Sequence, residues 1–126
     1  MNKKIINTKK APEPIGPYSQ AIKAGGLLFI SGQIALIPGT SELRTNDIRE
    51  ETKQVMNNLA AILETAGLEF SNVVKTTIFL KDMDLFPAVN EVYGQFFDSD
   101  FPARETVAVK GLPKDVNVEI SMIVSE

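Results

Sequence analysis

Arg104 and Glu119 are the two side chains whose chemistry best fits a site for a small carboxylic acid. Each lies in a segment with the alternating pattern of a β-strand, at residues 101–109 and 116–124. A guanidinium can hold a carboxylate through two parallel hydrogen bonds, and a glutamate can orient a water molecule or carry a proton. The sequence therefore predicts a site that binds a small acid and acts on it with water.

Alternation of apolar and polar residues assigns these side chains to faces of the expected sheet. In residues 116–124 the even-numbered positions are apolar and predict a core face, so Glu119 points to the other face. In residues 101–109 we assign Val107 and Val109 to the core, which places Arg104 on the same face as Glu119. The full set expected there is Phe29, Thr77, Phe79, Arg104, Thr106, Glu119, Ser121 and Ile123. This mixed face predicts a subunit interface in a closed oligomer.

Periodicity and turn residues predict the other elements. Further strands are expected at residues 5–6, 20–24, 27–34 and 73–80, and Gly25-Gly26 is typical of a hairpin turn. An apolar stripe at helical spacing predicts a helix from Asp47 to Ala66, with Asp47 and Glu50 as a capping box. A second helix should be capped by Asp84. The order β-β-β-α-β-α-β-β favours an α+β fold in which two helices cover one face of a mixed sheet.

Composition excludes several mechanisms. The chain has 126 residues, which predicts one domain over 1–126, and it has no cysteine, no histidine and a net charge of −3. A Ser-His-Asp triad, a Cys nucleophile and the usual zinc site are thus excluded, so we expect no metal and no cofactor. The acidic balance argues against nucleic acid as the main partner. Residues 1–10 lack the apolar segment of a secretory signal, and no apolar run is long enough for a membrane helix. We expect a cytoplasmic protein.

The sequence resembles the Rid family, the reactive intermediate deaminases also called the YjgF family. The motifs that carry the resemblance are residues 11–12, 15–21, 29–33, 74–80, 90–93, 101–104, 112–115 and 118–120. Resemblance to this family implies a chorismate-mutase-like α+β subunit that forms a homotrimer with three clefts between subunits. It also implies hydrolysis of 2-imino acids or their enamine tautomers, such as 2-iminobutanoate and 2-iminopropanoate, to 2-keto acids and ammonia.

The resemblance also implies roles for single residues. Arg104 would hold the substrate carboxylate and Glu119 would orient the attacking water. The residues implied to line the cleft are Tyr18, Ser31, Gly32, Asn90 and Thr106. Glu105 departs from the family pattern, which usually has a small or apolar residue there. Our face assignment turns Glu105 toward the helices, unless it lies at a sheet edge or the strand begins elsewhere.

Other functions stay open on the sequence alone. The favoured class is a cofactor-free deaminase, and the second is a non-catalytic trimeric module that binds small carboxylates or keto acids. Arg104 fits both classes, whereas Glu119 in the site favours the enzyme. RNA cleavage or inhibition of translation is a third class, attached to some relatives, and the acidic charge argues against it. Arg104 and Glu119 could also form a structural ion pair, and Ser31 or Asn90 could make structural hydrogen bonds only.

Overall fold

Six strands form one mixed sheet in the computed structural model, which describes residues 2–126. In space the strands run in the order β1-β2-β3-β6-β4-β5. Their bounds are β1 (Lys4–Ile6), β2 (Ala21–Ala24), β3 (Leu27–Gln33), β4 (Val73–Leu80), β5 (Ala103–Ala108) and β6 (Val118–Ser125). The β4–β5 pair is parallel, and the other neighbouring pairs are antiparallel. Gly25 and Gly26, both at positive φ, form the β2–β3 hairpin turn.

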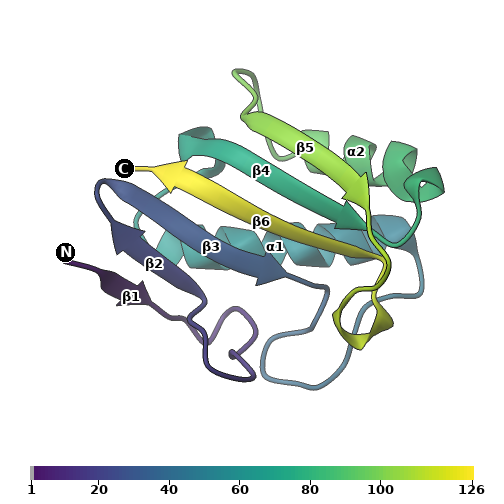
Figure 1. The fold of residues 1–126 in the computed structure, drawn as a ribbon, viewed down its shortest axis with the longest axis horizontal. Helices are drawn as coiled ribbons and strands as arrows, with labels where there is room; N and C mark the ends of the chain where they lie inside the picture. Colours follow the sequence, from purple (N-terminus) through teal and green to yellow (C-terminus); the bar gives the residue numbers. More distant parts are fainter. Residues whose placement is uncertain (1) are drawn as a thin grey trace.

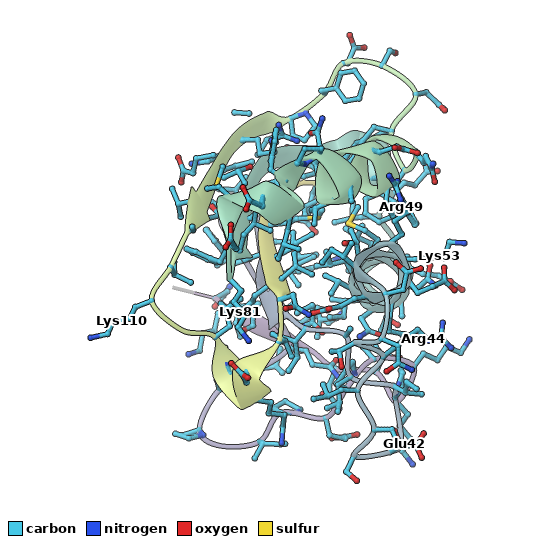
Figure 2. All side chains as sticks on the ribbon, turned by 90° about the vertical axis from the view of Figure 1, so that its right-hand side faces the viewer. Glu42, Arg44, Arg49, Lys53, Lys81 and Lys110 are labelled. Carbon is cyan, nitrogen blue, oxygen red and sulfur yellow. The ribbon has the colours of Figure 1, made fainter. Side chains whose placement is uncertain are left out.

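Two helices, α1 (Ile48–Thr65) and α2 (Phe86–Gly94), lie behind the sheet in Figure 1 and leave its other face open. This confirms the predicted α+β fold with two helices on one face of a mixed sheet. In Figure 2, Lys53 projects from α1 on the side away from the strands. None of the helices within residues 2–126 is long and apolar enough to cross a membrane.

Aspartate side chains cap α1 and the 3₁₀ turn that precedes α2. Asp47 caps α1 as predicted, because its side chain accepts a hydrogen bond of 2.9 Å from the Arg49 amide. The predicted capping box is not formed, because among the described residues the Glu50 side chain does not accept a hydrogen bond from the Asp47 amide. The predicted cap Asp84 is wrong. The Asp82 carboxylate accepts from the Asp84 amide at 2.8 Å and begins a 3₁₀ turn, Met83–Leu85, that leads into α2. The turn that leads into α2 is therefore capped two residues before the predicted position, at Asp82 instead of Asp84.

The core lies between the sheet and the two helices. The even-numbered residues of β6 face it, and Val118, Ile120 and Val124 are fully buried. The contributions from α1 and α2 are Val55, Met56, Leu59, Ile62, Leu63, Val89 and Tyr93. The alternation of β6 thus places Glu119, an odd-numbered residue, on the open face as predicted.

The predicted faces of β5 are wrong. Arg104 is in register with Thr76 of β4, and Thr106 is in register with Ile78. Thr76 and Ile78 are fully buried on the helix side, and neighbouring residues in register share a face. Arg104 and Thr106 therefore face α2, while Val107 faces the open side and is 44% exposed. The alternation fails because β5 is an edge strand beside a short helix, where two valines need not mark the core.

The rest of the open face is as expected. Phe29 pairs with Ile123, Thr77 with Ser121, and Phe79 with Glu119 across the strands. Phe29 is 43% exposed. Glu105 and Val107 take the places predicted for Arg104 and Thr106 on this face. Both alternatives given for Glu105 are confirmed. β5 is an edge strand, and it begins at Ala103 rather than Phe101.

Candidate functional site

Six of the seven predicted site residues fall into two separate pockets, and Thr106 lines neither. We call the first the glutamate pocket: Tyr18, Ser31, Gly32 and Glu119 line a cavity of about 510 Å³ together with the loop at residues 12–15. We call the second the arginine pocket: Asn90 and Arg104 line a hollow of about 430 Å³ with Tyr93, Gly94, Phe101 and Pro102.

A bulge in β3 makes room for Glu119. The β3–β6 pairing runs from Ile30–Met122 to Gln33–Ile120, so β3 has one extra residue at Ser31-Gly32. The Glu119 carboxylate lies against Gly32, where an added Cβ would be 2.5 Å from Glu119 Oε2. Any side chain at position 32 would displace the carboxylate. Gly32 thus contributes space rather than a side chain.

Glu119 is a half-buried carboxylate whose surroundings favour its protonated form. The side chain is half-buried, and within residues 2–126 it has no ion-pair partner. Burial raises the pKa of the Glu119 carboxyl above its usual value, because desolvation disfavours the charged form. A carboxylate with a raised pKa is a stronger base and can accept a proton from water.

Buried polar groups position Tyr18. Gln20 is 2% exposed, and its amide nitrogen donates 2.9 Å hydrogen bonds to the carbonyl oxygens of Thr8 and Pro12. The Ser31 hydroxyl donates to the carbonyl oxygen of Ser19 at 2.6 Å, so this hydroxyl holds the loop next to Tyr18. The Tyr18 side chain itself is 53% exposed and available to a ligand. Sequence reasoning missed Gln20, although it follows Tyr18 and Ser19 directly.

A buried glutamate fixes the start of β6. Glu51 of α1 is fully buried and accepts hydrogen bonds from the Asn117 amide at 2.8 Å and the Asn117 side chain at 2.7 Å. Asn117 precedes Glu119 by two residues. The neighbouring 3₁₀ turn, Pro113–Asp115, adds Lys114 to the pocket wall with a φ of 53°. Sequence reasoning missed Glu51 and Lys114, and Glu51 lies in line with the apolar stripe of α1.

The arginine pocket is built on one side of α2. Arg104 Nη1 donates a 2.7 Å hydrogen bond to Asn90 Oδ1. The Arg104 Cζ lies 5.4 Å from the ring centroid of Phe86 and 5.2 Å from that of Tyr93. The Tyr93 hydroxyl donates to Thr76 Oγ1 at 3.0 Å. Burial raises the pKa of Tyr93, against the opposing effects of Thr76 and Arg104, so the phenol stays protonated.

The remaining residues of β5 have other surroundings. Thr106 Oγ1 is buried without a hydrogen-bond partner among the described residues. Its hydroxyl oxygen is enclosed on the helix side of the sheet. On the open face Glu105 pairs with Lys75 Nζ at 3.3 Å and accepts from Thr77 Oγ1 at 3.4 Å. The structure thus brings Asn90 to Arg104, and Tyr18, Ser31 and Gly32 to Glu119.

Arg104 and Glu119 cannot share one site within a single chain. Arg104 is in register with Thr76, and Glu119 with Phe79, on either side of β4. Their Cα atoms are therefore separated by about 10 Å along the strands and about 10 Å across them. Their side chains leave the sheet on opposite faces. Within residues 2–126 no group of three or more Asp, Glu, His or Cys side chains is arranged to hold a metal ion.

Comparison with known proteins places this chain in a family. The family model described as endoribonuclease L-PSP matches residues 8–126. A RutC family protein of Pyrococcus horikoshii is 53% identical over 121 residues, covering 96% of each protein. A 2-iminobutanoate/2-iminopropanoate deaminase of Dermatophagoides farinae is 48% identical, covering 97% of this chain and 95% of its own. The crystal structure of E. coli TdcF with bound serine is 41% identical and has a TM-score of 0.93 over 98% of each chain.

These matches extend over nearly the whole chain and include proteins named as enzymes as well as one solved with a small amino acid. The chain therefore belongs to the endoribonuclease L-PSP family, the YjgF or Rid family that its motifs resemble.

Proposed function

We propose that this protein forms a homotrimer and hydrolyses 2-imino acids to 2-keto acids and ammonia between its subunits. The observation that carries the proposal is the separation of Arg104 from Glu119 on opposite faces of one sheet. A second copy that docks its arginine pocket against the glutamate pocket would complete the site. Cyclic symmetry would repeat this contact three times and close the assembly.

The open face supports such docking. Phe29 and Val107 are 43% and 44% exposed, and Phe79 and Ile123 lie beside them in the sheet. Apolar groups gathered on one face in this way are typical of a protein interface. The ion pair between Glu105 and Lys75 lies on the same face, at the outer strand. Burial of this face between copies would cover the apolar side chains.

The chemistry follows from the two pockets. In the proposed cleft Arg104 holds the substrate carboxylate, which places the C2 carbon of the imine near Glu119. Glu119 accepts a proton from water as the oxygen adds to C2 of the protonated imine, and it returns this proton to the nitrogen of the resulting carbinolamine. Ammonia then leaves, and the carbinolamine hydroxyl gives its proton to the Glu119 carboxylate. The C–N bond breaks and the C=O bond of the keto acid forms.

The substrates we propose are 2-iminobutanoate and 2-iminopropanoate. The glutamate pocket has an apolar wall that includes Pro12, Pro14 and Ile15. Short alkyl groups such as methyl and ethyl can pack on this wall without an unpaired polar atom. The deaminase name of the D. farinae relative and the serine bound to TdcF fit a small substrate that carries a carboxylate.

A coupled assay tests this function. A threonine dehydratase would supply the imine, and release of 2-ketobutyrate would be followed with catalytic amounts of this protein. We expect faster release that depends on Arg104 and Glu119. Acceleration that stops after one equivalent would indicate a carboxylate-binding module instead, and hydrolysis of RNA without imine hydrolysis would favour the ribonuclease that the family description names.

A further inference from the structure

We infer that Phe86 and Tyr93 are positioning residues that orient the guanidinium of Arg104 for the substrate carboxylate. The inference rests on the proposed function and extends it to two aromatic rings outside the predicted site. Neither ring needs to touch the substrate to act in this way. They fix the orientation of the guanidinium plane and limit the rotamers of the Arg104 side chain.

The spacing of the residues on α2 creates this arrangement. Phe86, Asn90 and Tyr93 follow one another at i, i+4 and i+7, so all three lie along one side of the helix. Arg104 reaches this side from the start of β5. Its guanidinium carbon lies 5.4 Å from the Phe86 centroid and 5.2 Å from the Tyr93 centroid. Asn90 accepts from Nη1 at 2.7 Å, so three contacts define the position of one group.

The Tyr93 ring is itself held in place. Tyr93 is 3% exposed, and its hydroxyl donates to Thr76 Oγ1 at 3.0 Å. Thr76 is fully buried and is the residue of β4 in register with Arg104. The strand that positions the Arg104 backbone therefore also fixes the ring beneath the Arg104 side chain. This hydrogen bond satisfies the buried tyrosine hydroxyl, which would otherwise lack a partner.

Such fixation matters for binding. A free arginine side chain has many rotamers, and their loss opposes binding of a ligand. Here the rotamer is already selected before a carboxylate arrives, so less freedom is lost on binding. A guanidinium has five N–H donors. Only one of them is used by Asn90, which leaves donors for a two-point contact with the carboxylate.

Simple core packing is the competing explanation, and a double-mutant cycle separates the two. Affinity for 2-ketobutyrate, the proposed product, would be measured by titration calorimetry for the full-length protein. The variants are Phe86→Leu, Arg104→Ala and the double variant. Phe86→Met, which fills the space without a ring, is the second test of the position. Phe96→Leu is the matched control, because that ring contacts Phe70 rather than Arg104.

We expect Phe86→Leu and Phe86→Met to weaken 2-ketobutyrate binding by about twofold to thirtyfold, the range of a cation–π contact. In the Arg104→Ala background the same changes should have no further effect, because the group they position is gone. Tyr93→Phe keeps the ring but loses its hydrogen bond to Thr76, so it should weaken binding less than the Phe86 variants do. Phe96→Leu should bind as the unmodified protein does.

Equal losses with and without Arg104 would overturn the positioning role, and so would unchanged affinity in both Phe86 variants. These results would leave the proposed function intact as long as Arg104→Ala itself weakens binding. Unchanged affinity in a folded Arg104→Ala protein would overturn the proposed function and this inference together.

Discussion

Arg104 and Glu119 leave the same sheet in opposite directions, with β4 between their strands. Arg104 turns toward α2, where its guanidinium lies beside the rings of Phe86 and Tyr93. Glu119 turns to the open face and lies against Gly32. This relationship means that the two groups can act on one small molecule only if they come from different copies of the chain.

Replacing Arg104 by lysine should weaken product binding although the positive charge is kept. A lysine ammonium cannot reproduce the two-point contact of the planar guanidinium. We expect 2-ketobutyrate binding to weaken by about 1.5–3 kcal/mol, the scale of a hydrogen bond to a charged group. Titration calorimetry measures the change. Unaltered affinity in folded Arg104→Lys would contradict an arginine-anchored carboxylate.

The pH dependence of turnover should report Glu119. The carboxylate form is needed to accept a proton from water, so kcat/KM should fall as pH falls through the pKa of this group. Burial raises the pKa of Glu119, so the half-point should lie above the usual pKa of a free glutamate. Glu119→Gln should lose turnover at every pH and keep its affinity for 2-ketobutyrate. A normal pH profile in Glu119→Gln would remove Glu119 from the reaction.

The same shift affects stability in a defined direction. Because the folded-state pKa is raised, the carboxyl favours folding below its unfolded pKa, and this contribution is lost as pH rises through the folded pKa. The melting temperature of Glu119→Gln relative to the unmodified protein should therefore increase from pH 4 to pH 8. Scanning calorimetry at the two pH values would show whether this difference changes.

Gly32→Ala should remove activity with little loss of stability. The added Cβ would meet Glu119 Oε2 at 2.5 Å and push the carboxylate away from the cleft. Gly111→Ala is the matched control, since a Cβ there has no atom within 4 Å and the residue has no positive φ. The coupled assay and a melting curve on both variants are sufficient. Full activity in Gly32→Ala would show that the Glu119 position is not critical.

Glu51→Ala should destabilise the protein strongly. It removes both acceptors of Asn117 in a fully buried location and leaves two donors unpaired. We expect a loss of about 2–4 kcal/mol in the free energy of unfolding. Glu50→Ala is the control, because the exposed Glu50 makes only a 3.9 Å pair with Lys53. Denaturant melts of the two variants should differ, and equal melts would show that the Glu51 contacts contribute little.

The sequence predicted the elements well wherever periodicity was long. Eight residues of β6 alternate between core and open face without a break, and the whole of β4 lies where it was expected. The α1 cap Asp47 was also predicted. In each case the apolar positions face a core formed by the same chain, so burial leaves a clear pattern in the sequence.

The predictions failed for residues whose neighbours lie in other helices, strands and loops. The faces of β5 were reversed because an edge strand beside α2 accepts an arginine over aromatic rings and exposes Val107. Glu51 and Gln20 were missed because charged or amide side chains are usually exposed. Their burial depends on partners at Asn117, Thr8 and Pro12, which are distant in the sequence.

Mixed trimers test the shared site most directly. Arg104→Ala and Glu119→Gln would each be inactive alone, and equal amounts would be unfolded together and refolded. In the proposed trimer a site takes Arg104 from one chain and Glu119 from the next. The site is intact when the chain that supplies Arg104 carries Glu119→Gln and the chain that supplies Glu119 carries Arg104→Ala. In randomly mixed closed assemblies each of these two conditions is met at about one half of the sites, so about a quarter of the sites should be intact. We predict recovery of about a quarter of the unmodified activity in the coupled assay. No recovery, with native mass spectrometry confirming mixed trimers, would contradict a site built from two chains.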